Sequence, residues 1–137
     1  MPKLALISTS LGVFIFAGLI PFLEISDTHL VNPGWPSHAR LHEAWQLLTN
    51  GALSILALGL VWKVSAPKIG IGIALIISIS FLMSWILGRF YGGSMLHSDG
   101  TEMAVAGVNV AVIVVSILTA LLVLSYRAVS SHIRSLT

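Results

Sequence analysis

The chain has 137 residues, of which 56% are hydrophobic and only 9% are charged. An average soluble domain carries about a quarter charged residues, so this composition argues against a soluble fold. Cysteine is absent, which excludes disulfides, thiolate metal sites and a cysteine nucleophile. The formal net charge is only +2, so the placement of the basic residues matters more than their sum.

Long apolar stretches predict an all-α, polytopic membrane protein, a four-transmembrane-helix bundle in a single domain over residues 1–137. The predicted helices cover about residues 4–23, 37–64, 69–91 and 102–128. No internal repeat or low-complexity segment interrupts them. Four crossings of about 20 residues each consume most of the length, so we expect no large soluble domain in these residues.

The first apolar stretch has two interpretations. A single Lys3 before an apolar run is typical of a signal peptide. We favour a retained helix, because the run from Leu4 to Leu23 is about long enough to span a bilayer. Pro21, near its end, predicts a helix terminator or a kink. The polar stretch that follows, from Glu24 to Trp35, contains adjacent proline and glycine residues and is typical of a loop.

Capping residues and glycines predict where the other helices begin and end. Ser37 is a candidate N-cap for the second helix. Residues 66–68 form a tight connection to the third helix, which Gly92–Gly93 end. Thr101 is a candidate N-cap for the fourth helix, with Glu102 in its first turn supported by the helix dipole.

The basic residues are distributed unevenly between the two ends of this bundle. With four crossings, both termini and the short connection share one side, and the two longer loops share the other. The first side holds Lys3, Lys63, Lys68, Arg127 and Arg134, and the second holds Arg40 and Arg89. Because basic residues concentrate on the cytoplasmic side, we expect cytoplasmic termini and a periplasmic or extracellular position for the longer loops.

The carboxylates, and every histidine except His132 in the tail, fall at the end with the longer loops. They are Glu24, Asp27, Glu43, Asp99, Glu102, His29, His38, His42 and His97. Ionisable groups near membrane spans are costly, so their concentration at one end indicates a polar site. The plainer interpretation is that loops and helix ends lie in water and hold the few charged residues for that reason alone.

His38 and His42 are the sharpest single signal for chemistry. Their spacing of four residues puts both imidazoles on one helix face, one turn apart, where they can share a metal ion. The neighbouring glutamate, Glu43, follows the second histidine instead of the first. The pattern therefore differs from that of the zinc proteases and implies no protease mechanism.

Side chains of the two longer loops can complete a ligand shell around these histidines. The candidate ligands are Glu24, His29, His97, Asp99 and Glu102, with Asp27 beside them. Such a mixture of imidazole and carboxylate suits a divalent metal, namely zinc, iron or manganese, although the Glu-x-x-His spacing of two-metal bundles is absent. Without a metal, the same groups can act as general acids and bases. The candidates for that catalytic role are His38, His42, Glu43 and Asp27.

A structural role explains the histidines without any chemistry, if they bond loop carbonyls and hold the first loop over the bundle. A polar stripe nevertheless continues from His42 along the second helix through Trp45 or Gln46 to Thr49 and Asn50. Such a stripe should face the interior of the bundle.

Polar residues on the other two helices lie near the same depth. Arg89 either extends to the interface or pairs with a carboxylate. Asn109 shares a predicted helix face with Glu102 and can approach Asn50 or Gln46, in a contact worth ~1 kcal/mol.

The aromatic residues form an interfacial belt or line a pocket for a lipophilic, ring-shaped molecule. They are Trp35, Trp45, Trp85, Phe90 and Tyr91. The full set of candidate cofactor-binding residues is Trp35, Trp45, Gln46, Asn50, Arg89 and Asn109.

The stretch from Thr28 to His42 carries the pattern Thr-His-x-x-Asn-Pro-x-Trp-Pro-x-His-Ala-Arg-x-His. It resembles the signature of a family of small four-helix membrane proteins of bacteria and fungi, and the segments 91–93 and 99–102 are similar as well. The resemblance covers most of the chain and implies a four-helix fold, but it supplies no activity. It directs interest to His29, Asn32, Trp35, His38, Arg40 and His42.

Three functional hypotheses of different classes follow. The first is a membrane-embedded enzyme or binding protein that uses a metal or acid-base chemistry on a lipophilic small molecule. The second is a non-catalytic subunit that packs against a larger membrane complex or forms a homo-oligomer. The third is a transporter or proton-conducting bundle, against which the almost wholly apolar stretch from Leu53 to Val61 counts. No phosphate-binding glycine motif, basic stripe or serine nucleophile motif is present, which argues against nucleotide, nucleic-acid and hydrolase functions.

Overall fold

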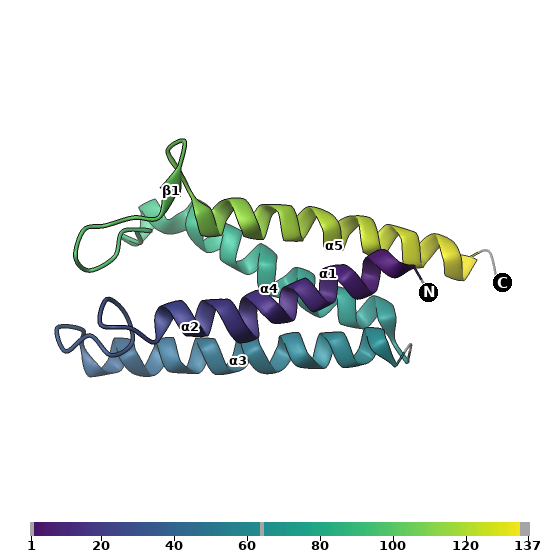
Figure 1. The fold of residues 1–137 in the computed structure, drawn as a ribbon, viewed down its shortest axis with the longest axis horizontal. Helices are drawn as coiled ribbons and strands as arrows, with labels where there is room; N and C mark the ends of the chain where they lie inside the picture. Colours follow the sequence, from purple (N-terminus) through teal and green to yellow (C-terminus); the bar gives the residue numbers. More distant parts are fainter. Residues whose placement is uncertain (1, 64, 135–137) are drawn as a thin grey trace.

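The computed structural model describes residues 2–63 and 65–134 (Figure 1). Within these residues, four helices are long and apolar enough to cross a membrane. They pack side by side into an all-α bundle, so the predicted class of multi-pass four-helix membrane protein is confirmed. The predicted domain limits at residues 1 and 137, and the predicted end of the second helix at Val64, lie outside the described residues.

The first span continues through the proline that the sequence marks as a terminator or kink. It consists of α1 (Lys3–Val13), the π-helical segment η1 (Phe14–Leu19) and α2 (Ile20–Glu24). A proline inside an α-helix loses one backbone hydrogen bond and crowds the carbonyl one turn before it. The wider π-helical turn directly before Pro21 relieves this crowding, and the helix therefore runs on to Glu24.

The second and third spans are α3 (Ser37–Trp62) and α4 (Pro67–Leu87), the latter extended by a 3-10 turn, η2 (Gly88–Phe90). Ser37 is the first residue of α3 and not its N-cap, and no side chain caps this helix end. The predicted end of the third span is confirmed, because Gly92 adopts a φ of +74° and the N–H of Gly93 donates to the carbonyl of Gly88 at 2.8 Å.

The fourth span, α5 (Val110–Arg134), begins later than expected because a hairpin precedes it. Strands β1 (Ala104–Val105) and β2 (Val108–Asn109) are antiparallel, with Val105 opposite Val108. The two residues between them both have a positive φ, as a two-residue hairpin turn of this type requires.

The predicted start of this helix at Thr101 and Glu102 was therefore wrong. The residue that caps α5 is Asn109, whose Oδ1 accepts the N–H of Ala111 at 2.9 Å. A turn with positive φ cannot continue a helix, so the chain forms the hairpin first and α5 starts only after it. The predicted helix face shared by Glu102 and Asn109 does not exist, because both residues precede α5.

The helices pack with α3 and α5 at opposite corners of the bundle, because α1 and α4 each contact both of them. Small residues permit this close packing, as expected between membrane helices. A Cβ on Gly70 of α4 would lie 2.5 Å from the carbonyl oxygen of Ala57 in α3. On the other side of the bundle, a hydrogen bond of 2.9 Å joins the buried hydroxyls of Ser8 in α1 and Ser125 in α5.

The two ends of the bundle differ in character. Helix α1 begins at one end of the bundle, where α3 and α5 end, and we call this the terminal end (Figure 1). The other, the loop end, carries the first long loop (residues 25–36) and the second long loop (residues 91–103). In Figure 1, α4 starts beside α3 at the terminal end and finishes beside the start of α5 at the loop end.

Candidate functional site

The two long loops are joined to each other at the loop end. Asn32 Nδ2 of the first loop donates to Ser98 Oγ of the second at 2.8 Å, and Ser98 Oγ donates to the carbonyl oxygen of Thr28 at 2.9 Å. The rings of His29 and His97 meet edge to face with their centroids 4.8 Å apart. These contacts link segments that are far apart in the sequence, and they hold the loops together over the end of the bundle.

Of the two histidines in this loop contact, His29 has more side-chain partners. Its Nδ1 lies 2.9 Å from Thr28 Oγ1 and 3.3 Å from Ser26 Oγ, while its Nε2 lies 3.4 Å from Glu24 Oε2. A neutral ring that carries its proton on Nε2 satisfies this arrangement, because a hydroxyl can donate to Nδ1 while Nε2–H faces the carboxylate.

The protonation of His29 follows from the same surroundings. Burial lowers its pKa, and the neighbouring His97 lowers it further. The carboxylates of Glu43 and Asp99 oppose this shift without reversing it. His29 is therefore uncharged at neutral pH and joins the loops as a neutral hydrogen-bonding group.

His38 and His42 form a second, separate pair on α3. Their Nε2 atoms are 3.0 Å apart, their rings meet edge to face, and both side chains are exposed. Across residues 2–63 and 65–134, no group of three or more His, Asp or Glu side chains lies close enough together to hold a metal ion. The predicted shell that joins this pair to the loop residues therefore receives no support from the structure.

The acidic residues of the long loops lie in different surroundings. Asp27 is exposed. The carboxylate of Asp99 is exposed as well, and Oδ1 accepts hydrogen bonds from the hydroxyl and the backbone N–H of Thr101, which lower the pKa of Asp99. These contacts close a local turn in the second long loop.

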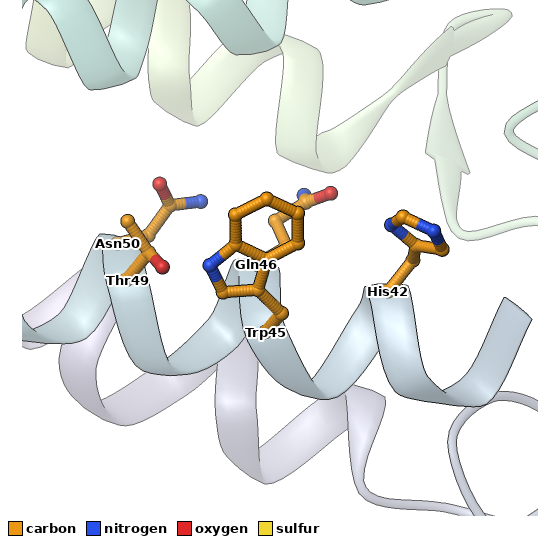
Figure 2. A pocket seen from close by; sticks show the side chains of 5 residues that line it. All are labelled: His42, Trp45, Gln46, Thr49 and Asn50. Atoms are coloured by element: carbon orange, nitrogen blue, oxygen red, sulfur yellow. The ribbon is translucent and has the colours of Figure 1, made fainter. Parts of the chain in front are cut away.

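The predicted polar stripe lines a shallow hollow of about 320 Å³ on α3. Figure 2 shows its side chains projecting from one side of the helix, away from the α1–α2 segment. The lining residues are His42, Trp45, Gln46, Thr49 and Asn50.

A larger space of about 910 Å³ adjoins this hollow at Gln46 and is called the main cavity here. It lies between α3, the last turns of α4 and the second long loop. Its aromatic lining comprises Trp35, Phe81, Trp85 and Tyr91. Its polar lining comprises Glu43, Gln46, Ser84, Ser94 and Glu102.

Two side chains of this lining are held in place by specific contacts. Tyr91 Oη donates to the carbonyl oxygen of Ser84 at 2.6 Å, and a Cβ on Gly93 would lie 2.5 Å from the ring, so only glycine leaves room for it. Asn109 Nδ2 donates to Glu102 Oε1 at 3.1 Å. Asn109 thus caps α5 and orients a carboxylate of the cavity, where the sequence suggested a contact with Asn50 or Gln46.

Arg89, another predicted binding residue, lines neither space. Its guanidinium lies 4.7 Å from the ring centroid of the neighbouring Phe90. The face of this span that lines the cavity instead carries Phe81, Trp85 and Gly88. The spacing of these three residues, four and then three positions apart, was the signal that could have revealed this face.

Comparisons with models of known protein families, with curated proteins and with solved structures found no match. The resemblance inferred from the motif between Thr28 and His42 therefore stays a prediction. The fold defines the chain as a multi-pass four-helix membrane protein, and its function has to be argued from the geometry of the loop end.

Proposed function

We propose that this protein binds a lipophilic small molecule in the main cavity. The observation that carries the proposal is the lining of that cavity, in which aromatic rings share one space with two carboxylates and a carboxamide. A volume of about 910 Å³ suits a small organic ligand, and such sites combine a mostly apolar wall with a few polar groups. Lipophilic molecules reach a site between membrane helices directly from the bilayer.

We propose that side chains of the main cavity carry out acid-base chemistry on the bound molecule. Glu43 and Glu102 are the candidates for moving protons, because both carboxylates line the cavity. Asn109 is a positioning residue in this scheme, since it donates to Glu102 and touches the cavity only through it.

We further propose that the loop end faces the periplasm or the extracellular space and the terminal end faces the cytoplasm. Five of the seven Lys and Arg residues belong to the terminal end, while all five carboxylates belong to the loop end. Since basic residues in short connections favour the cytoplasmic side, this distribution supports cytoplasmic termini.

Photolabelling tests the binding proposal. We expect 4-methylbenzophenone to label the detergent-solubilised protein saturably, at peptides that contain residues 35–46 and 81–102. Ala39→Phe places a ring in the lining and should reduce this labelling at least about fivefold, as a filled pocket excludes its ligand. Ala52→Phe, at an exposed position of the same helix outside both spaces, is the matched control. Labelling spread evenly over all helices, or unchanged in Ala39→Phe, would contradict the proposal.

We also propose that the His38 and His42 pair binds a divalent transition metal ion such as zinc. Two Nε2 atoms 3.0 Å apart are spaced for two bonds of about 2.0–2.1 Å to one ion, with water completing the coordination. Equilibrium dialysis of the purified protein against zinc chloride, followed by elemental analysis, measures the site. We expect His38→Ala with His42→Ala to lose one equivalent of zinc, and His132→Ala to retain it. Equal zinc content in all three proteins would refute the site.

A further inference from the structure

The charged residues that line the main cavity are of one sign. Among the described residues, they are Glu43 and Glu102, and no lysine, arginine or histidine joins them. Arg89 is the second residue of η2, next to the lining residue Gly88. Its guanidinium nevertheless lies over the ring of Phe90 and outside the cavity lining. An anionic molecule in this space would therefore face two carboxylates without a basic partner. This repulsion strongly disfavours the binding of anions.

Two further titratable groups, Glu24 and His29, lie near Glu43. His29 is the histidine whose pKa burial lowers, so at neutral pH it brings no positive charge to offset the two carboxylates. The groups near Glu43 therefore add no positive charge to the carboxylates of the cavity lining.

The aromatic lining supplies the second requirement for recognising a cation. Trp35, Trp85 and Tyr91 line the same space as the two carboxylates. The faces of such rings attract ammonium groups, and tryptophan does so most strongly. The hydrogen bond from Tyr91 to the Ser84 carbonyl fixes one of these rings before any ligand arrives, which reduces the entropy lost on binding.

From the acidic and aromatic lining together, we infer that the ligand of the main cavity is a lipophilic cation, an amine or quaternary ammonium compound with an apolar body. The inference rests on the proposed binding function and names its substrate class. The ammonium group lies between the rings and the carboxylates, and the apolar body extends along the helices towards the lipid.

Three photolabels with one reactive body test the inference. They are (4-benzoylbenzyl)trimethylammonium, neutral 4-methylbenzophenone and anionic 4-benzoylbenzoate, each applied to the full-length protein in a non-ionic detergent. We expect the cation to reach half-maximal labelling of the cavity peptides at about a tenfold lower concentration than the neutral compound, and the anion to label them least.

Charge-neutral variants assign the preference to the cavity. Glu43→Gln and Glu102→Gln should each reduce the advantage of the cation over the neutral compound at least about threefold. Asp27→Asn removes an exposed carboxylate at the same end of the molecule and should leave this advantage unchanged. Should a variant fail to fold, as judged by gel filtration, the ranking of the three labels on the wild-type protein still decides the matter.

The failures of the two proposals are distinguishable. Equal labelling by the cation and the neutral compound, or a preference for the anion, overturns the inferred ligand class and leaves the binding function standing. Absence of saturable cavity labelling by all three compounds overturns the binding function itself. A cation preference that both glutamine variants retain in full also overturns the inference, because the charge would then be recognised elsewhere.

Discussion

His29 sits where the two long loops meet, and its surroundings connect protonation to the stability of that contact. Its Nδ1 lies 2.9 Å from the Thr28 hydroxyl and its ring packs against His97, so a second proton would put a positive charge on a partly buried ring beside His97. A histidine in an ordinary exposed loop has no such consequence.

The sign of the expected pH effect follows from the lowered pKa of His29. Burial first, and His97 second, shift the pKa below its ordinary value of 6.5. The unfolded chain then binds more protons than the folded protein between the two pKa values, so the free energy of unfolding rises with pH in that window. We expect the protein to lose stability as the pH falls from about 7 through about 6. Thermal unfolding in detergent at a series of pH values measures the effect.

His29→Gln should remove this component of the pH dependence, since glutamine can bond to Thr28 without titrating. His132→Gln, at the terminal end, is the control and should keep the wild-type profile. Hydrogen exchange at residues 28–32 and 97–98 should report the same loss locally. An unchanged slope in His29→Gln would show that another group controls the stability in this window.

At the scale of a single element, the crossing of α3 and α4 depends on one glycine. A side chain at Gly70 would meet the backbone oxygen of Ala57 at 2.5 Å and Val61 Cγ2 at 2.8 Å. The first of these atoms belongs to the backbone of a helix and cannot turn away. Only a separation of the two helices makes room for an added methyl group.

Gly70→Ala should therefore lower the free energy of unfolding by about 1–3 kcal/mol, the range typical of an overpacked core. Gly72→Ala is the matched control, because it adds the same methyl group to the same helix in open space and also improves helix propensity. Reversible unfolding in mixed micelles, followed by tryptophan fluorescence, compares the two variants. Equal stabilities would mean that α3 and α4 do not cross as closely as described.

Helix ends show how far local sequence signals reach. The glycines after η2 predicted its end correctly, because a residue with positive φ stops a helix wherever it occurs. The start of α5 was missed, although Ala106–Gly107 and Asn109 are short-range signals for a hairpin and a cap. The apolar residues from Met103 onwards extended the helical pattern backwards and concealed them.

At the scale of the whole molecule, the orientation in the membrane can be measured directly, because the chain contains no cysteine. Val105→Cys places a thiol on the exposed β1 strand of the loop end, and Ser65→Cys places one in the exposed connection of the terminal end. With the loop end outside, a membrane-impermeant maleimide should label the first variant in intact cells and the second only after lysis. The reverse pattern would invert the proposed orientation, and the cysteine-free parent controls for background.

The four spans, their order and the collection of carboxylates at one end were determined by the sequence alone. Apolar runs long enough to cross a bilayer need no partner to be recognised, and polar residues between them have to lie at its surfaces. The side-by-side position of His38 and His42 was equally local, since one helical turn separates them.

The composition of the site was decided only by the tertiary structure. Sequence spacing relates residues within one helix, whereas the presence of Glu43 and Glu102 in the lining of one cavity depends on how α3 and α4 cross and where the hairpin begins. The same holds for the pairing of His29 with His97, which joins two loops through contacts that neither loop determines by itself. Helix rotation and loop packing are properties of the assembled bundle, and they separated the four histidines at the loop end into two pairs.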